Sequence, residues 1–198
     1  MQTALIVLGA YLVGSISFAV LVSRLFGLPD PHTYGSGNPG ATNVLRTGNR
    51  LAAALTVAGD GGKGFLAVFL AQTLGPSFGV ADWTVPAVAL AVFVGHLFPV
   101  FHRFAGGKGV ATAAGIVFAL SWPLGLALLA LWMVMALGIK ISSLAALTTA
   151  TLAPLGAFYV FGNAPTAWAL VPITLLLFWR HRANIRQLIE GKERTIGR

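Results

Sequence analysis

The sequence predicts an all-α integral membrane protein, and both its composition and its hydropathy pattern indicate this class. Of the 198 residues, 57% are hydrophobic and 9% are charged, and the mean hydropathy is +0.83. Soluble globular domains do not reach these values. Apolar runs separated by short polar connections recur along the chain. We therefore expect one polytopic domain over residues 1–198, with about seven transmembrane helices.

The apolar runs differ in length, so some of the expected helices are short. Five are about as long as a membrane crossing: 2–22, 85–101, 124–139, 141–160 and 166–179. Three are shorter: 51–59, 65–74 and 110–120. The basic tail, 180–198, has the periodicity of a helix with one apolar side.

The positive charges predict the orientation of the chain. Three connections, 75–84, 121–123 and 162–165, contain a single charged residue, Asp82. The other connections and the tail contain the lysines and arginines, and such loops lie in the cytoplasm. The amino terminus is then outside and the carboxyl terminus is cytoplasmic. This arrangement requires 41–59 to dip into the membrane and return, or to lie as a partly buried helix. The net charge of +8 thus reflects topology and an anionic substrate, and we predict no nucleic-acid partner.

A polar stretch at residues 35–46, GSGNPGATNVLR, stands out in this apolar chain. Glycines let the backbone turn sharply and approach a ligand closely. Serine, threonine and asparagine supply donors and acceptors, and Arg46 supplies a fork of N–H groups suited to phosphate. The segment therefore predicts a substrate-binding loop at the membrane surface.

Two Gly-Gly-Lys-Gly sequences, at 61–64 and 106–109, are each expected to form a turn that opens a short helix. Free amides at a helix amino terminus bind phosphate, and the lysine adds a positive charge. Neither copy is a Walker A motif. A tight turn with a topogenic lysine is the alternative interpretation, and the flanking sequences do not support an internal duplication.

A third polar cluster follows the last apolar run. His181 and Asn184 are three residues apart and share a helix face, where they would orient a phosphate or a hydroxyl. Arg180 and Arg182 are most simply charges at the end of a span. Ser142 and Ser143 either bind substrate or cap a helix.

The residue types that are missing narrow the chemistry. The chain has no cysteine, only five acidic residues and no metal-binding spacing of histidines and acids. We therefore predict no metal and no cofactor. An enzyme of this composition would work by positioning two substrates and stabilising charge, with an activated donor supplying the driving force.

Three motifs resemble the bacterial membrane acyl-phosphate:glycerol-3-phosphate acyltransferases. Residues 35–46 resemble the first family signature, 95–99 (GHLFP) with 106–109 the second, and 181–185 (HRANI) with 191–193 (GKE) the third. The resemblance covers nearly the whole chain in order. One departure is the sequence PDPH at 29–32, which replaces an Asp-hydrophobic-Arg step and leaves His32 as a partial substitute for the arginine.

The resemblance implies a seven-span helical enzyme of phospholipid biosynthesis in the bacterial cytoplasmic membrane, with its active site facing the cytoplasm. It would transfer a fatty acyl group from acyl phosphate to the 1-hydroxyl of sn-glycerol 3-phosphate, giving lysophosphatidic acid and phosphate. Its expected partners are these two substrates, membrane lipid and the soluble enzyme that makes acyl phosphate.

The resemblance also implies roles for individual residues. Ser36, Arg46 and Lys108 are the expected catalytic residues. Ser36 and Arg46 would hold glycerol phosphate, while Lys108 would neutralise the phosphate of either substrate, with the amides of the glycines beside it. Glu193 would tie the tail to an arginine. The expected substrate-binding residues are Asn38, Thr42, Asn43, Gly106, Gly107, Gly109, Ser142, Ser143, His181 and Asn184.

A transporter of a phosphorylated solute is the alternative function. It would share the basic glycine-rich loops, but it needs polar groups along a route to the other side of the membrane. The apolar runs 85–101 and 124–139 offer no such route. A purely structural role for the glycines does not explain Ser36, Asn43 and Arg46 together.

Overall fold

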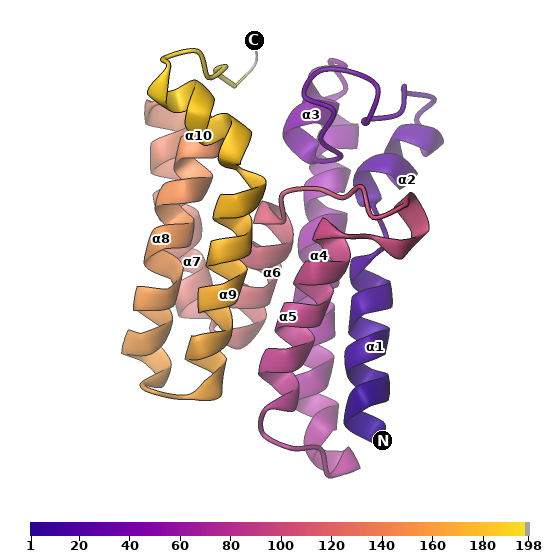
Figure 1. Ribbon diagram of the computed structural model, residues 1–198, viewed down its shortest axis with the longest axis vertical. Helices are drawn as coiled ribbons and strands as arrows, with labels where there is room; N and C mark the ends of the chain where they lie inside the picture. Colours follow the sequence, from indigo (N-terminus) through magenta and orange to yellow (C-terminus); the bar gives the residue numbers. More distant parts are fainter. Residues whose placement is uncertain (197–198) are drawn as a thin grey trace.

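The structure is a computed structural model that describes residues 1–196, and helices joined by short loops account for its regular structure (Figure 1). No strand occurs within these residues, so the predicted all-α class is confirmed. The α-helices are α1 (Gln2–Gly14), α2 (Phe18–Leu25), α3 (Ala41–Leu45), α4 (Arg50–Leu74), α5 (Thr84–Leu97), α6 (Val110–Leu120), α7 (Trp122–Gly138), α8 (Ser142–Phe161), α9 (Pro165–Arg180) and α10 (Arg182–Ile189). Two 3-10 helices, η1 (Gly75–Phe78) and η2 (Val100–His102), follow α4 and α5.

The helices form two groups that share α6 (Figure 1). Helices α1, α4 and α5 pack together on one side, and α7, α8 and α9 pack on the other. Helix α6 contacts both α4 and α7. The short helices α2, α3 and α10 lie toward one end of the molecule, and the amino terminus lies at the opposite end (Figure 1). The loop at residues 35–46 and the segment after α9 therefore lie at the same end of the molecule.

The apolar run 2–22 contains a bend of 43° between α1 and α2. Ser17 begins α2 as its N-cap and accepts a hydrogen bond from the amide of Val20. The break leaves the Ile16 carbonyl free to accept a hydrogen bond from Lys63 Nζ at 2.7 Å. A polar contact thus holds the bend against α4.

The prediction of a glycine-lysine turn at 61–64 is wrong, because these residues lie inside the 25-residue helix α4. The short apolar runs 51–59 and 65–74 are parts of this one helix, so 41–59 does not dip and return. The glycines serve helix packing. A Cβ at Gly115 of α6 would collide with the Gly61 carbonyl, and one at Gly64 would collide with the Thr112 backbone. Only glycine lets the two helices approach this closely.

Lys63 and Asp60 form a buried ion pair within α4. The Lys63 ammonium lies 2.8 Å from Asp60 Oδ1, and both side chains are less than 5% exposed. His96 Nδ1 of α5 lies 3.5 Å from the same carboxylate oxygen, and Thr112 donates to the Asp60 carbonyl. Lys63 is therefore neutralised inside the helix bundle and is not a topogenic charge in a loop.

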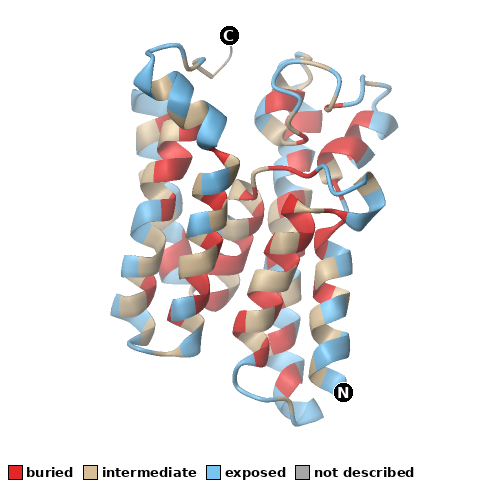
Figure 2. Cartoon of the chain, viewed as in Figure 1, coloured by how far each residue is buried: buried red, intermediate tan, exposed pale blue. Residues whose placement is uncertain are grey.

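The outer faces of the helices are apolar and exposed, as Figure 2 shows for the flanks of the bundle. Tyr159, Leu137 and Leu175 are 92%, 69% and 65% exposed. A surface of this kind suits lipid. Three helical stretches, at 50–78, 84–102 and 142–161, are long and apolar enough to cross a membrane, and the bent pair α1–α2 would be a fourth. Helices α6, α7 and α9 are apolar but shorter.

Candidate active site

The loop at residues 35–46 is organised by one buried side chain, Asn43. Its Nδ2 donates to the carbonyls of Pro31 and Tyr34 at 2.8 and 3.1 Å. Its Oδ1 accepts from the Ser36 amide and from Arg46 Nη1, both at 3.0 Å. Asn43 is 2% exposed and has both ends of its amide engaged. It therefore shapes the loop and aims Arg46, whereas the sequence also predicted contact with substrate.

Two glycines give this loop its turns. Gly35 and Gly37 have φ values of 60° and 65°, in the left-handed region that glycine adopts without strain. A Cβ at Gly35 would also collide with Asn43 Oδ1. The tight turn at Gly35 thus brings the backbone against the side chain that organises the loop.

The second loop runs from Pro99 to Gly109 and leads into α6. We call residues 106–109 the glycine loop. Arg180 of α9 donates from Nε to the Gly107 carbonyl at 3.0 Å and from Nη2 to the Gly106 carbonyl. The prediction that Arg180 is only a charge at the end of a span is therefore wrong. The Gly107 amide donates to the His96 carbonyl at 3.2 Å, which removes it from the predicted phosphate ligands.

The end of the glycine loop presents free amides beside Lys108. Gly109 has a φ of 86°, and a Cβ there would collide with Phe93, so only glycine fits. Within the described residues, the amides of Lys108 and Gly109 have no hydrogen-bond partner, and α6 begins at the next residue. Free amides at a helix amino terminus attract anions.

Lys108 is linked to the carboxyl-terminal segment by a chain of hydrogen bonds. Its Nζ donates to Asn184 Oδ1 at 2.6 Å, and Asn184 Nδ2 donates to Glu193 Oε1 at 2.6 Å. Ser143 Oγ donates to the same Glu193 oxygen at 2.6 Å. Glu193 therefore ties the tail to α8 and α10. The sequence predicted an arginine as its partner, and this prediction is wrong. Burial lowers the pKa of Lys108 to about 8, against the opposing effect of Glu193.

His181, the first residue after α9, is 2% exposed. Burial lowers its pKa to about 4, so the ring is neutral at pH 7. Its Nδ1 lies 2.8 Å from the Leu177 carbonyl, which can only accept, so Nδ1 carries the proton. Nε2 is then an acceptor suited to a hydroxyl group, which selects one of the two roles predicted for this residue.

A cavity of about 710 Å³ brings the candidate residues together. Helices α6, α7, α8 and α9 supply the apolar part of its wall, including Val117, Leu128, Ala150 and Ile173. The polar part contains every predicted site residue except Gly106 and Gly107. These are Ser36, Asn38, Thr42, Asn43, Arg46, Lys108, Gly109, Ser142, Ser143, His181 and Asn184.

A polar recess of about 140 Å³ shares part of this wall. The residues that line both spaces are Ser36, Arg46, Asn184, Glu193 and Arg194, and Gly35 and Gln187 complete the recess. Thr42 Oγ1 of α3 lies 3.5 Å from Ser142 Oγ of α8, and both residues line the larger cavity. The recess thus presents two guanidinium groups beside the polar end of the larger cavity.

The sequence did not predict several residues of the site. Arg194, Thr195 and Ile196 fold over the cavity, and the Ile196 amide donates to the Lys140 carbonyl at 2.7 Å. Asp60 and His96 also reach the cavity wall. Apart from its positive charge, nothing in the sequence of the tail indicates that it lines the site. The opposite charges of Asp60 and Lys63, three residues apart, do indicate an ion pair on one face of a helix.

Comparisons with known proteins identify the family. The family model for glycerol-3-phosphate acyltransferase matches residues 4–191. A glycerol-3-phosphate acyltransferase of Cupriavidus pinatubonensis is 60% identical over 199 residues and covers 100% of this chain and 98% of its own length. One of Ralstonia nicotianae is 58% identical over 195 residues, with 98% and 94% coverage.

Solved structures agree with this result. The crystal structure of PlsY (YgiH), an integral membrane glycerol 3-phosphate acyltransferase, is similar in its glycerol 3-phosphate form, with a TM-score of 0.92 and 37% identity. The form with lysophosphatidic acid gives a TM-score of 0.90 and 36% identity. Both matches cover 100% of this chain and 96% of the solved chain. The family resemblance of the sequence motifs is confirmed, and the chain belongs to the glycerol-3-phosphate acyltransferases, a family of membrane enzymes.

Proposed function

We propose that this enzyme transfers a fatty acyl group from acyl phosphate to the 1-hydroxyl of sn-glycerol 3-phosphate, releasing lysophosphatidic acid and inorganic phosphate. The observation that carries the proposal is the cavity itself. One continuous wall joins cationic and amide groups at one end to an apolar space between four helices. A substrate with an acyl chain and a phosphate fits such a space, and a small phosphorylated solute leaves its apolar part unused.

The acceptor phosphate binds in the polar recess. Arg46 and Arg194 supply guanidinium groups there, and the Asn184–Lys108 hydrogen bond brings an ammonium to the same wall. Guanidinium groups bind phosphate through paired hydrogen bonds, and a charged lysine adds a point charge. Ser36 adds a hydroxyl. The glycerol 1-hydroxyl then extends toward the larger cavity.

The donor phosphate lies against the amides of Lys108 and Gly109 at the start of α6, and the acyl chain follows the apolar wall. His181 Nε2 accepts a hydrogen bond from the 1-hydroxyl and orients its oxygen. That oxygen attacks the acyl carbonyl carbon, and the bond from this carbon to the phosphate oxygen breaks. The departing phosphate takes the hydroxyl proton, so no strongly basic side chain is needed.

The proposed topology has seven crossings, by α1, α4, α5, α6, α7, α8 and α9. An odd number of crossings agrees with the amino terminus and α10, which follows the last crossing, lying at opposite ends of the molecule (Figure 1). The positive residues of the loops put the site on the cytoplasmic side of the bacterial inner membrane. Acyl phosphate made by a soluble enzyme would reach it there.

The test is release of phosphate and formation of lysophosphatidic acid by purified protein in lipid, supplied with palmitoyl phosphate and glycerol 3-phosphate. We expect both products only when both substrates are present. Arg46→Ala should abolish turnover. Arg182→Ala is the matched control, because this arginine is exposed, packs on Trp179 and, within residues 1–196, lines neither space. Phosphate release that does not depend on glycerol 3-phosphate would contradict the proposal.

A further inference from the structure

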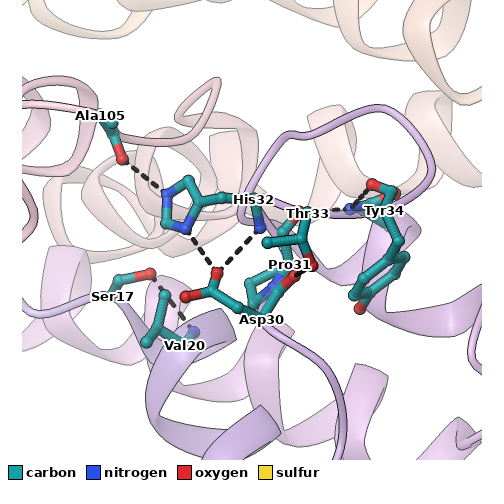
Figure 3. Close-up of polar contacts among 9 residues, drawn as sticks. Ser17, Val20, Asp30, Pro31, His32, Thr33, Tyr34 and Ala105 are labelled. Atoms are coloured by element: carbon teal, nitrogen blue, oxygen red, sulfur yellow. Dashed lines mark hydrogen bonds and ion pairs between the residues drawn. The ribbon is translucent and has the colours of Figure 1, made fainter.

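His32 joins the loop at residues 35–46 to the segment that carries the glycine loop (Figure 3). Its Nδ1 lies 2.7 Å from Asp30 Oδ1, and its Nε2 lies 2.9 Å from the carbonyl oxygen of Ala105. The backbone amide of His32 also donates to Asp30 Oδ1 at 2.9 Å. A single imidazole ring therefore bridges two segments 73 residues apart in sequence.

Both partners of the ring can only accept hydrogen bonds. A carbonyl oxygen has no proton to give, and an ionised carboxylate has none either. The hydrogen bond from the His32 backbone holds the pKa of Asp30 below its ordinary value, so this carboxylate is ionised. Both ring nitrogens must then donate, and only the protonated imidazolium has two N–H groups. A neutral ring can keep one of the two contacts and loses the other.

The Ala105 carbonyl is the first of three successive carbonyls held by cationic side chains. His32 binds that of Ala105, and Arg180 binds those of Gly106 and Gly107. These contacts fix the segment from two sides, since His32 lies before α3 and Arg180 ends α9. The free amides of the glycine loop follow directly.

We propose that His32 is a positioning residue whose imidazolium holds Ala105 and so keeps the glycine loop in its phosphate-binding conformation, which makes capture of substrate weaker when the ring loses its proton. The contact itself stands on geometry, and its effect on substrate rests on the proposed function. Histidine is the side chain whose charge ordinarily changes between about pH 5 and 8. The test therefore compares the protein at pH 5.5 and at pH 8.

Other charged or titratable groups lie near His32, and the test has to separate their effects from that of His32. They are Asp30, Arg24 at the end of α2, and His102 of η2. Lys108 changes charge near pH 8, in the wild type and in a variant alike. Comparison of each variant with the wild type at the same pH cancels the titration of Lys108 and of the substrate phosphate.

Two substitutions separate charge from shape. His32→Arg keeps a cation with several donors at every pH, and His32→Gln is neutral at every pH. We expect the KM for palmitoyl phosphate of the wild type to rise about threefold relative to His32→Arg between pH 5.5 and 8, as fits a partly exposed charged contact. His32→Gln should have the weaker KM throughout, with kcat little changed. His102→Gln is the matched control, because the His102 side chain makes no hydrogen bond within the described residues.

Hydrogen exchange gives a readout that does not depend on acyl transfer. The amides of Phe104, Ala105 and Gly107 are hydrogen-bonded to carbonyls of the same region, so their protection reports the order of the segment. After correction for intrinsic exchange, protection should fall with rising pH in the wild type and stay constant in His32→Arg.

Identical pH dependence of protection in the wild type and His32→Arg would overturn the proposed role of His32. A His32→Gln variant with the same KM and the same protection as the wild type at pH 5.5 would overturn it too. If neither the wild type nor any variant transfers acyl groups but protection changes as expected, the positioning role of His32 stands and the proposed reaction fails. If acyl transfer occurs and protection does not change with pH, the proposed reaction stands and the positioning role of His32 fails.

Discussion

At the residue level, the proposed phosphate-binding role of Lys108 predicts that substrate capture depends on pH. In the proposed function, phosphate binds the charged form of Lys108, and this form is lost as the pH rises through about 8. The second ionisation of a phosphate monoester lies near pH 6, so the substrate keeps its charge across this range. We expect kcat/KM for glycerol 3-phosphate to fall above pH about 8. The value of kcat should persist to higher pH, because the bound phosphate favours the charged lysine.

The measurement is a series of initial rates from pH 6.5 to 9.5 at saturating acyl phosphate, with a protein-free control for spontaneous hydrolysis. Lys108→Met should lower kcat/KM by about 10- to 100-fold at pH 7, the size of a lost charged hydrogen bond. A wild-type profile that stays flat to pH 9.5 would contradict this role for Lys108.

At the level of elements, single and double substitutions of Asp60 and Lys63 test how strongly the buried ion pair inside α4 stabilises the fold. Removing one partner of a buried pair leaves the other charge unpaired, which costs roughly 3–5 kcal/mol, whereas replacing both is often tolerated. We expect Asp60→Asn and Lys63→Met each to lower the unfolding temperature in detergent strongly. The double variant should be more stable than either single one. Additive losses would show that the two side chains act independently.

The two Gly-Gly-Lys-Gly sequences show how far local sequence predicts an element. The copy at 106–109 follows Pro99 and a non-glycine turn at Arg103 and Phe104, where φ is positive, and it forms the predicted loop. The copy at 61–64 is helical, because α6 presents Gly115 to it and the close contact stabilises the helix. Four identical residues thus adopt two conformations, and the deciding partner lies about fifty residues away.

The candidate site was predictable to the extent that its residues are polar in an apolar chain. Ser36, Arg46, Lys108 and Asn184 stood out on this ground, and the structure places them in one cavity wall. The part played by Arg180 was not predictable, because its partners are backbone carbonyls of Gly106 and Gly107. Every residue has a carbonyl, so sequence carries no mark of such a contact.

At the level of the whole molecule, the apolar part of the cavity predicts selection by chain length. Ala153 of α8 lines it about 16 Å along the helix from Ser142. We expect Ala153→Phe to lower kcat/KM for palmitoyl phosphate and to leave decanoyl phosphate nearly unchanged, because only the longer chain reaches this depth. Leu155→Phe is the matched control, since Leu155 is 61% exposed on the outer face. Equal losses for both donors would place the acyl chain elsewhere.

The carboxyl-terminal segment that covers the cavity also has a practical consequence for handling the protein. Ile196 is held to Lys140 and Glu193 to Ser143, and both Glu193 and Ile196 line the cavity. Met1 is fully exposed at the opposite end of the bundle (Figure 1). A purification tag joined close behind Ile196 would pull on the cover of the site, whereas a tag before Met1 leaves it undisturbed. Assays of this enzyme are therefore best built on amino-terminal fusions.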